Sequence, residues 1–344
     1  MRTADGVDWA WRTELKQTHG LRWGWAGNGA IRLAGVRVLV TNDDGVNAPG
    51  LAALTRALVR WVDAVAVAGG PRHEIVVVAP SSNYSGAGAA VGSVTERTTI
   101  AYSRAKVEGA ESVEAFGLDA SPALSVIAGA LGAVGPKPDL VLSGINHGVN
   151  VGRSVLHSGT VGAALTAAQL GISALAVSLR AGVTPDPWDS AAELATSLIP
   201  VLAAAPTSTV LNLNVPALPL SEILGLRWAK VSGAGLIKAA SEAGEWDGPN
   251  SPEMEGPAAL EGSRSVMEGN GEARGEIVLT VGSPFPPGGD VGMNESTEDA
   301  GLVAQGYAAL TALRGPRADD DPELLGLLNS GLAAALAPLG LAAR

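Results

Sequence analysis

The chain has no cysteine and few aromatic residues, and acidic side chains outnumber basic ones. The missing thiols exclude disulfides, thiolate zinc sites and cysteine nucleophiles. With aromatics at 4 %, the core must be built mainly from aliphatic side chains. The net charge of −11 argues against binding of nucleic acid polymers, which needs basic surface. A small phosphorylated substrate stays possible, because a bound cation can reverse the local field.

Long hydrophobic runs are also missing. The first 35 residues carry scattered charge and lack the apolar segment of a signal peptide. The stretch that comes nearest to a membrane span, Leu324 to Ala343, is uncharged but is interrupted by Asn329, Ser330 and Pro338. This stretch predicts a buried or partner-facing C-terminal helix rather than a membrane span, so we expect a cytoplasmic protein without a membrane partner.

Short apolar runs, each ending at polar or turn-forming residues, begin at Val36. Nearly continuous runs of this kind are typical of strands buried on both faces. Helical stretches separate them, and strand–helix alternation predicts an α/β fold with a mostly parallel, Rossmann-like sheet covered by helices on both faces. The predicted strands are 36–40, 75–79, 140–142, 174–177 and 210–214, and the predicted helices are 50–62, 121–131, 161–170 and 188–202.

The domain prediction follows from this alternation. Residues 1–35 are an N-terminal extension, and residues 36–316 form one α/β domain. Within that domain, residues 240–275 are rich in Gly, Glu, Ser and Pro and predict an exposed loop, after which Ile277 to Val281 could form a further strand. Residues 317–344 predict the C-terminal helix, which we expect to serve oligomerisation.

Oxygen-bearing side chains gather where the predicted strands end. Asp43 and Asp44 follow the first strand, Ser85 lies shortly after the second, and Asn146 follows the third. Ligands of open α/β sheets bind at the carboxyl ends of the strands, so these side chains should share one edge. An all-oxygen set favours Mg²⁺, Mn²⁺ or Ca²⁺ over zinc. The alternative is that Asn42 to Gly45 is an ordinary turn.

Ser158, Gly159 and Thr160 precede a predicted helix, whose free N–H groups can hold a phosphate. The alternative is a plain helix cap without a ligand. His147 and His157 lie in glycine-rich segments and could assist acid–base chemistry or simply be hydrogen-bonded loop residues, whereas His73, in a polar connection, should face solvent. Gly86 to Gly88 fits a dinucleotide fingerprint poorly, and no nucleophile-elbow motif is present.

The order of these motifs resembles the SurE family of 5′/3′-nucleotidases over roughly Val36 to Leu313. The segment Val38 to Gly50, with the letters VLVTNDDGVNAPG, is similar to the opening motif of that family. Further similar segments follow in the same order: 77–80 (VVAP), 83–86 (NYSG), 138–146 (PDLVLSGIN), 148–150 (GVN), 158–164 (SGTVGAA), 174–178 (ALAVS), 213–216 (LNVP), 297–300 (TEDA) and 306–307 (GY).

The resemblance implies a Rossmann-like metal-dependent phosphomonoesterase that hydrolyses nucleoside monophosphates, and in some members short polyphosphate. It implies one divalent cation per subunit, Mg²⁺ or Mn²⁺ with Ca²⁺ as a substitute, and self-association as a dimer or tetramer. The metal ligands map onto Asp43, Asp44, Ser85 and Asn146. The catalytic set is Asp43, Asp44, Ser158 and Thr160, and we expect substrate contacts from Asn83, Gly159, His147 and Asn150.

The sequence departs from the family pattern at a few positions. Ser81 and Ser82 stand where Asp-Arg is usual, and His157 replaces a tyrosine before Ser-Gly-Thr. Leu124 stands where the family has an acidic residue, and Ile277 to Leu279 replace an aromatic cluster. These changes bear on substrate preference and turnover. They also leave a second interpretation open, in which the chain is a non-catalytic or weakly catalytic nucleotide-binding module.

For the chemistry, we expect a bound cation to polarise the phosphate and to lower the pKa of a bound water. Asp43 or Asp44 would orient or deprotonate that water, and Ser158 and Thr160 would stabilise the added negative charge. Attack by a carboxylate, through an aspartyl-phosphate, is the alternative.

Overall fold

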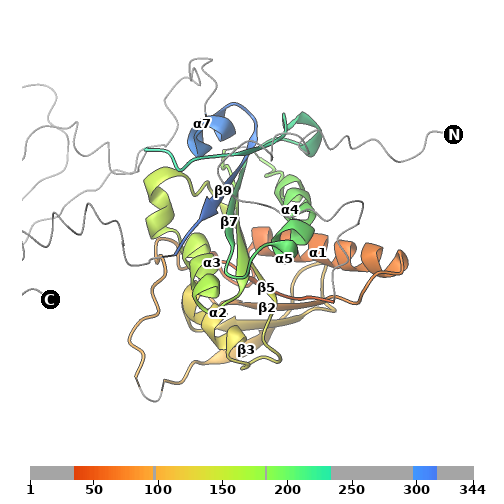
Figure 1. Ribbon diagram of the computed structural model, residues 1–344. Helices are drawn as coiled ribbons and strands as arrows, with labels where there is room; N and C mark the ends of the chain where they lie inside the picture. Colours follow the sequence, from red (N-terminus) through yellow and green to blue (C-terminus); the bar gives the residue numbers. More distant parts are fainter. Residues whose placement is uncertain (1–34, 96–97, 183, 234–296, 316–344) are drawn as a thin grey trace, which may run out of the picture. The chain divides into compact units, whose positions relative to one another are not determined.

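The structure, a computed structural model, describes residues 35–95, 98–182, 184–233 and 297–315. These residues form one sheet flanked by helices (Figure 1). Four of the sequence predictions lie outside them: the extension 1–35 (apart from its last residue), the loop 240–275, the strand 277–281 and the C-terminal helix 317–344. Within the described ranges, no helix is long and apolar enough to cross a membrane.

The sheet has the strand order β3-β4-β2-β1-β5-β6-β7-β9-β8. Its central strands, from β4 to β7, run parallel, while β3 pairs antiparallel with β4, and β9 pairs antiparallel with β7 and parallel with β8. The strands are β1 (Arg37–Thr41), β2 (Glu74–Pro80), β3 (Tyr102–Ala105), β4 (Glu114–Leu118), β5 (Leu140–His147), β6 (Ser173–Leu179), β7 (Val210–Val215), β8 (Leu226–Trp228) and β9 (Ala308–Leu313).

Helices cover both faces of this sheet, with α1, α4 and α5 on one side and α2 and α3 on the other (Figure 1). Alternate residues of each strand serve the two sides: Val38 and Val40 pack towards α1 and α4, and Leu39 packs towards α2. The helices are α1 (Pro49–Val67), α2 (Pro122–Ala130), α3 (Gly159–Gln169), α4 (Trp188–Ser197), α5 (Ile199–Ala204) and α7 (Asp299–Ala304), with short 3₁₀ turns η3 (Gly152–His157) and η4 (Leu220–Glu222).

The predicted α/β fold with a mostly parallel sheet is confirmed, and the five predicted strands are β1, β2, β5, β6 and β7. The single helix predicted over 188–202 is instead two, α4 and α5, which meet at Leu198. Pro200, which has no backbone N–H, lies in the first turn of α5 and explains the break. The prediction that His73 faces solvent is wrong: it is 4 % exposed, its Nδ1 accepts the backbone N–H of Val36, and its ring packs on Trp61.

The topology decides where a site can form. From β1 the chain moves outward to β2 and β4, then returns to β5 on the other side of β1. The carboxyl ends of β1 and β5 therefore flank the switch point, where open α/β sheets bind ligands. Strand β5 carries a bulge here, because three steps from Ser143 to Asn146 oppose two steps from Ala176 to Ser178. The bulge sets the direction of Asn146 at the end of the strand.

Candidate active site

The turn after β1 holds the two predicted carboxylates. The Asn42 side chain closes this turn: its Nδ2 donates to the carbonyl of Gly45 at 2.9 Å, and its Oδ1 accepts the Gly45 N–H at 3.2 Å. Gly45 has a φ of 106°, which other residues rarely adopt. The segment is therefore a turn, and this turn fixes the backbone of Asp43 and Asp44 at the switch point.

Asp43 lies at the N-terminus of α3. It is 3 % exposed, and its Oδ1 accepts the Thr160 hydroxyl at 2.5 Å. Burial raises the pKa of Asp43, against the Thr160 hydroxyl and the backbone N–H groups of Thr160 and Gly159, which lower it. Only glycine fits at position 159, since a Cβ there would lie 2.7 Å from the Asp43 Cβ. The N-terminus of α3, which the sequence analysis predicted to bind phosphate, thus binds the Asp43 carboxylate.

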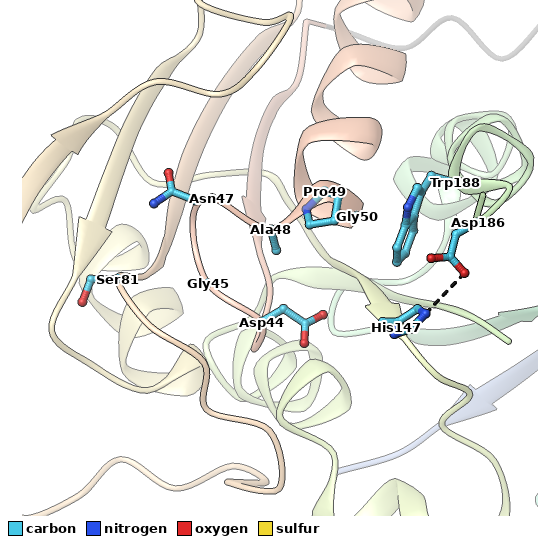
Figure 2. A pocket seen from close by; sticks show the side chains of 10 residues that line it. All are labelled: Asp44, Gly45, Asn47, Ala48, Pro49, Gly50, Ser81, His147, Asp186 and Trp188. Carbon is cyan, nitrogen blue, oxygen red and sulfur yellow. Dashed lines mark hydrogen bonds and ion pairs between the residues drawn. The ribbon is translucent and has the colours of Figure 1, made fainter. Parts of the chain in front are cut away.

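Asp44 points into a cleft beside the turn (Figure 2). Burial raises the pKa of Asp44, the negative charge of Asp43 raises it further, and the backbone N–H and side chain of His147 oppose both effects. Two neighbouring carboxylates thus lose water without gaining a full compensating charge. A divalent cation would supply that charge, and carboxylate oxygens are the ligands that such a cation prefers, so the donor set fits a hard metal ion.

The loop after β2 brings two further predicted residues to this turn. The N–H of Tyr84 donates to the carbonyl of Asp43 at 2.7 Å, which ties the loop to the carboxylate turn. The Asn83 Oδ1 accepts the N–H of Ser85 at 2.7 Å, and the side chains of Asn83 and Ser85 are exposed. The loop therefore carries the Ser85 hydroxyl next to the residue that bonds Asp43.

Asn146 is the last but one residue of β5, the strand on the other side of the switch point. Its Nδ2 donates to the carbonyl of Gly148 at 2.7 Å. This bond orients the amide and uses one of its two N–H donors, and the amide oxygen, as an acceptor, is the atom that can serve a cation. Among the described residues no cluster of three or more His, Cys, Asp or Glu could hold a metal. A metal at the switch point would accordingly depend on neutral oxygens, such as those of Asn146 and Ser85, beside the two carboxylates.

Asn150 has contacts within the protein framework. It is buried, its Nδ2 donates to the Ser178 hydroxyl at 2.7 Å, and its backbone N–H donates to the Asn214 Oδ1 at 2.7 Å. Its carbonyl accepts the side chains of Asn212 and Asn214. These bonds connect the segment after β5 to the ends of β6 and β7, so Asn150 positions that segment; its contact with substrate stays a prediction.

Ser158 and Asp299 hold the chain around α3. Ser158 is a helix cap, because its Oγ accepts the N–H of Val161 at 3.1 Å. Its catalytic role stays a prediction. The sequence analysis missed the role of Asp299, a fully buried residue whose Oδ2 accepts the Gly152 N–H at 3.0 Å and whose Oδ1 accepts the Ser232 N–H at 2.9 Å. Its place in the segment TEDA, one of the segments similar to the family, was the sequence feature that could have pointed to this role.

The cleft beside Asp44 has a volume of about 490 Å³. Its wall includes two residues that the sequence analysis did not single out, Asp186 and Trp188 (Figure 2). The His147 Nε2 lies 3.3 Å from the Asp186 Oδ1, and the rings of His147 and Trp188 are 5.6 Å apart. The lining residues are Asp44, Gly45, Asn47, Ala48, Pro49, Gly50, Ser81, His147, Asp186 and Trp188.

Comparison with known proteins decides the family. Residues 38–236 match the family model described as survival protein SurE. The chain belongs to the SurE family. It is 32 % identical over 280 residues to the 5′-nucleotidase SurE of Aeromonas hydrophila, covering 81 % of this chain and 92 % of that protein. It is also 32 % identical over 280 residues to the 5′/3′-nucleotidase SurE of Cronobacter sakazakii, covering 81 % and 90 %.

Among solved structures, the SurE protein from Aquifex aeolicus has the same fold. The comparison covers 86 % of this chain and 99 % of that chain, with a TM-score of 0.57 and 24 % identity. The predicted family, one of phosphoric monoester hydrolases, is thereby confirmed, together with the predicted fold.

The departures from the SurE pattern lie in different surroundings. Ser81 lines the cleft beside Asp44, so this change alters a surface open to ligands. His157 is exposed, and its carbonyl accepts the N–H of Gly88 at 3.1 Å, a bond that does not depend on the side chain. Leu124 is partly buried against the core on α2, where an aliphatic side chain packs well.

Proposed function

We propose that the chain is a divalent-metal-dependent phosphomonoesterase that hydrolyses nucleoside 5′-monophosphates, and 3′-monophosphates as well, to nucleoside and phosphate. The observation that carries the proposal is the pair Asp43 and Asp44 at the switch point, two adjacent carboxylates of which one is buried against the start of α3 and the other lines the cleft. The SurE relatives named 5′- and 5′/3′-nucleotidases support the substrate class.

The residues that would hold one cation are Asp43, Asp44, Ser85 and Asn146. Their donors are carboxylate, hydroxyl and amide oxygens, which favour Mg²⁺ or Mn²⁺ and accept Ca²⁺. When bound, the cation would neutralise the two carboxylates and polarise the phosphate of the substrate.

Side chains and backbone groups of the protein would position the water, the phosphate and the nucleoside. Thr160 donates a hydrogen bond to Asp43, and Asp44, which lines the cleft, would orient an attacking water. The residues proposed to contact the phosphate are Asn83, Ser158, Gly159 and Thr160, and N–H groups at a helix start stabilise added negative charge there. His147 lines the cleft and would contact the nucleoside, and Asn150 would position the segment that follows His147.

The test is phosphate release from AMP and GMP in EDTA, Mg²⁺ or Mn²⁺. We expect activity only with a cation, and we expect Asp43→Asn to reduce turnover by at least about 100-fold, since a charged ligand is lost. Asn146→Ala should weaken the metal affinity less, because its amide is neutral. Full activity in EDTA, or normal turnover of Asp43→Asn, would refute the metal-dependent mechanism. Nucleotide binding without phosphate release would favour the non-catalytic module.

Self-association as a dimer or tetramer and a cytoplasmic location belong to the same proposal. The uncharged stretch 324–343 is the sequence feature that favours an oligomer. Light scattering should therefore give a mass at least twice 34.5 kDa at micromolar concentration. A single species at the monomer mass would contradict it.

A further inference from the structure

The cleft beside Asp44 has one aromatic wall, formed by Trp188 at the start of α4. We propose that this wall is the nucleobase subsite, on which the base of the substrate stacks while its phosphate lies at Asp44. The inference rests on the proposed function and specifies it, because it assigns to Trp188 the recognition of the base.

The Trp188 ring is held in place by the protein around it. A Cβ at Gly50 would lie 2.9 Å from the ring, so the ring packs directly against the first turn of α1. Trp188 also packs against the core cluster beneath α1 and α4. The two helices are linked further by Arg60, whose Nη2 lies 2.7 Å from the Glu193 Oε1. A ring fixed in this way loses little freedom when a planar base stacks on it.

Polar side chains line the rest of the cleft. Figure 2 shows the Asp44 carboxylate turned towards the side where His147 and Trp188 lie, with Ser81 and Asn47 on the opposite side. The His147 ring is itself fixed by Asp186 at 3.3 Å. A cleft of about 490 Å³ has the size of small-molecule sites, and stacking on one wall with hydrogen bonding from the others is how nucleosides are held.

The charge of the cleft favours one phosphate over several. Asp44 and Asp186 both line it, and no Lys or Arg does so in the part of the chain that the structure describes. One phosphate can be served by the cation at Asp44, but a second phosphate in the cleft would meet the Asp186 carboxylate without a counter-charge. The subsite therefore fits the neutral base and ribose of a nucleoside monophosphate better than a polyphosphate chain.

The experiment compares AMP with ribose 5-phosphate, which has the same phosphate and sugar but no base, in the presence of Mn²⁺. Trp188→Ala and Trp188→Leu both remove the aromatic face, and Trp188→Phe restores one. We expect the ratio of kcat/KM for AMP to that for ribose 5-phosphate to fall about tenfold in the first two variants, mainly through KM, and to recover in the third. Trp228→Ala, on β8 outside the cleft, is the matched control and should leave the ratio unchanged.

Each outcome decides the proposal. An equal loss for both substrates means that Trp188 is only structural, and an unchanged ratio means that the base binds elsewhere; either result overturns the inference. If Trp188→Ala does not fold, Trp188→Leu carries the same test. If the wild type releases phosphate from no monoester, the proposed function has failed. Calorimetric titration with adenosine then tests the subsite alone, and equal affinity of wild type and Trp188→Leu would overturn it.

Discussion

Replacing Gly159 with alanine adds a single methyl group and should strongly reduce the activity of the site. The backbone of Gly159 is helical, so alanine is compatible with its conformation. The added Cβ, however, would lie 2.7 Å from the Cβ of Asp43 and 2.8 Å from its Oδ2. Carbon atoms in contact lie about 3.5–4.0 Å apart, so the Asp43 side chain would have to move by roughly 1 Å.

This movement should lower the free energy of unfolding and should lower the turnover more strongly. Asp43 would lose its short bond from the Thr160 hydroxyl and the backbone N–H groups at the start of α3. Hydrogen bonds to charged groups contribute about 1.5–3 kcal/mol, and the better helix propensity of alanine returns up to about 1 kcal/mol. The net loss of about 1–2 kcal/mol corresponds to a fall in Tm of roughly 2–8 °C. A displacement of about 1 Å in a catalytic group lowers turnover by about 100-fold.

Thermal unfolding and phosphate release from AMP with Mn²⁺ measure both effects. Gly315→Ala is the matched control, because a Cβ at Gly315 meets nothing within 4 Å, and it should behave like the wild type. A Gly159→Ala protein with unchanged turnover would show that the position of Asp43 against α3 does not matter for the reaction.

Three further predictions follow from the same contacts. The folded-state pKa values of Asp43 and Asp44 are raised above 3.8, so the metal-free protein should lose stability as pH rises from 3.8 through those values. Asp44→Asn should reduce this loss in denaturant titrations at a series of pH values, and a pH profile identical to that of the wild type would refute the prediction. Asp299→Asn places an amide N–H donor against the backbone N–H of Gly152 or Ser232, which is also a donor. The free energy of unfolding, measured by chemical denaturation, should therefore fall by about 1–3 kcal/mol. Removal of residues 1–35 should leave folding and activity intact; an insoluble or inactive truncated protein would contradict this.

The structure also changes one expectation about the carboxylate pair. From sequence, Asp43→Asn should leave stability near or above that of the wild type, because it relieves repulsion. In the structure Asp43 accepts hydrogen bonds from α3, which an asparagine amide would only partly replace. Asp44 is less buried and receives fewer such bonds, so Asp44→Asn is the variant in which relief of repulsion should dominate.

Local patterns predicted the central strands well because each is a short apolar run that ends at turn formers. The same rule did not find β9, Ala308–Leu313, whose Ala- and Leu-rich sequence is equally compatible with a helix. It also missed β4, where a glycine lies within the run, and β3, which is mostly exposed at the edge of the sheet. These segments form strands because each pairs with a neighbouring strand in the sheet. The local sequence of each segment does not indicate that pairing.

The sequence by itself determined the α/β class, the family and the acidic turn after β1, because these depend on residues close together in the chain. Only the tertiary structure decided that the start of α3 receives the Asp43 carboxylate, 117 residues away along the chain. It likewise decided that Trp188 forms a wall of the cleft with His147 and that Asp299 holds Gly152. Such contacts follow from the order in which strands join the sheet, and that order is set by the packing of the whole domain rather than by any one segment.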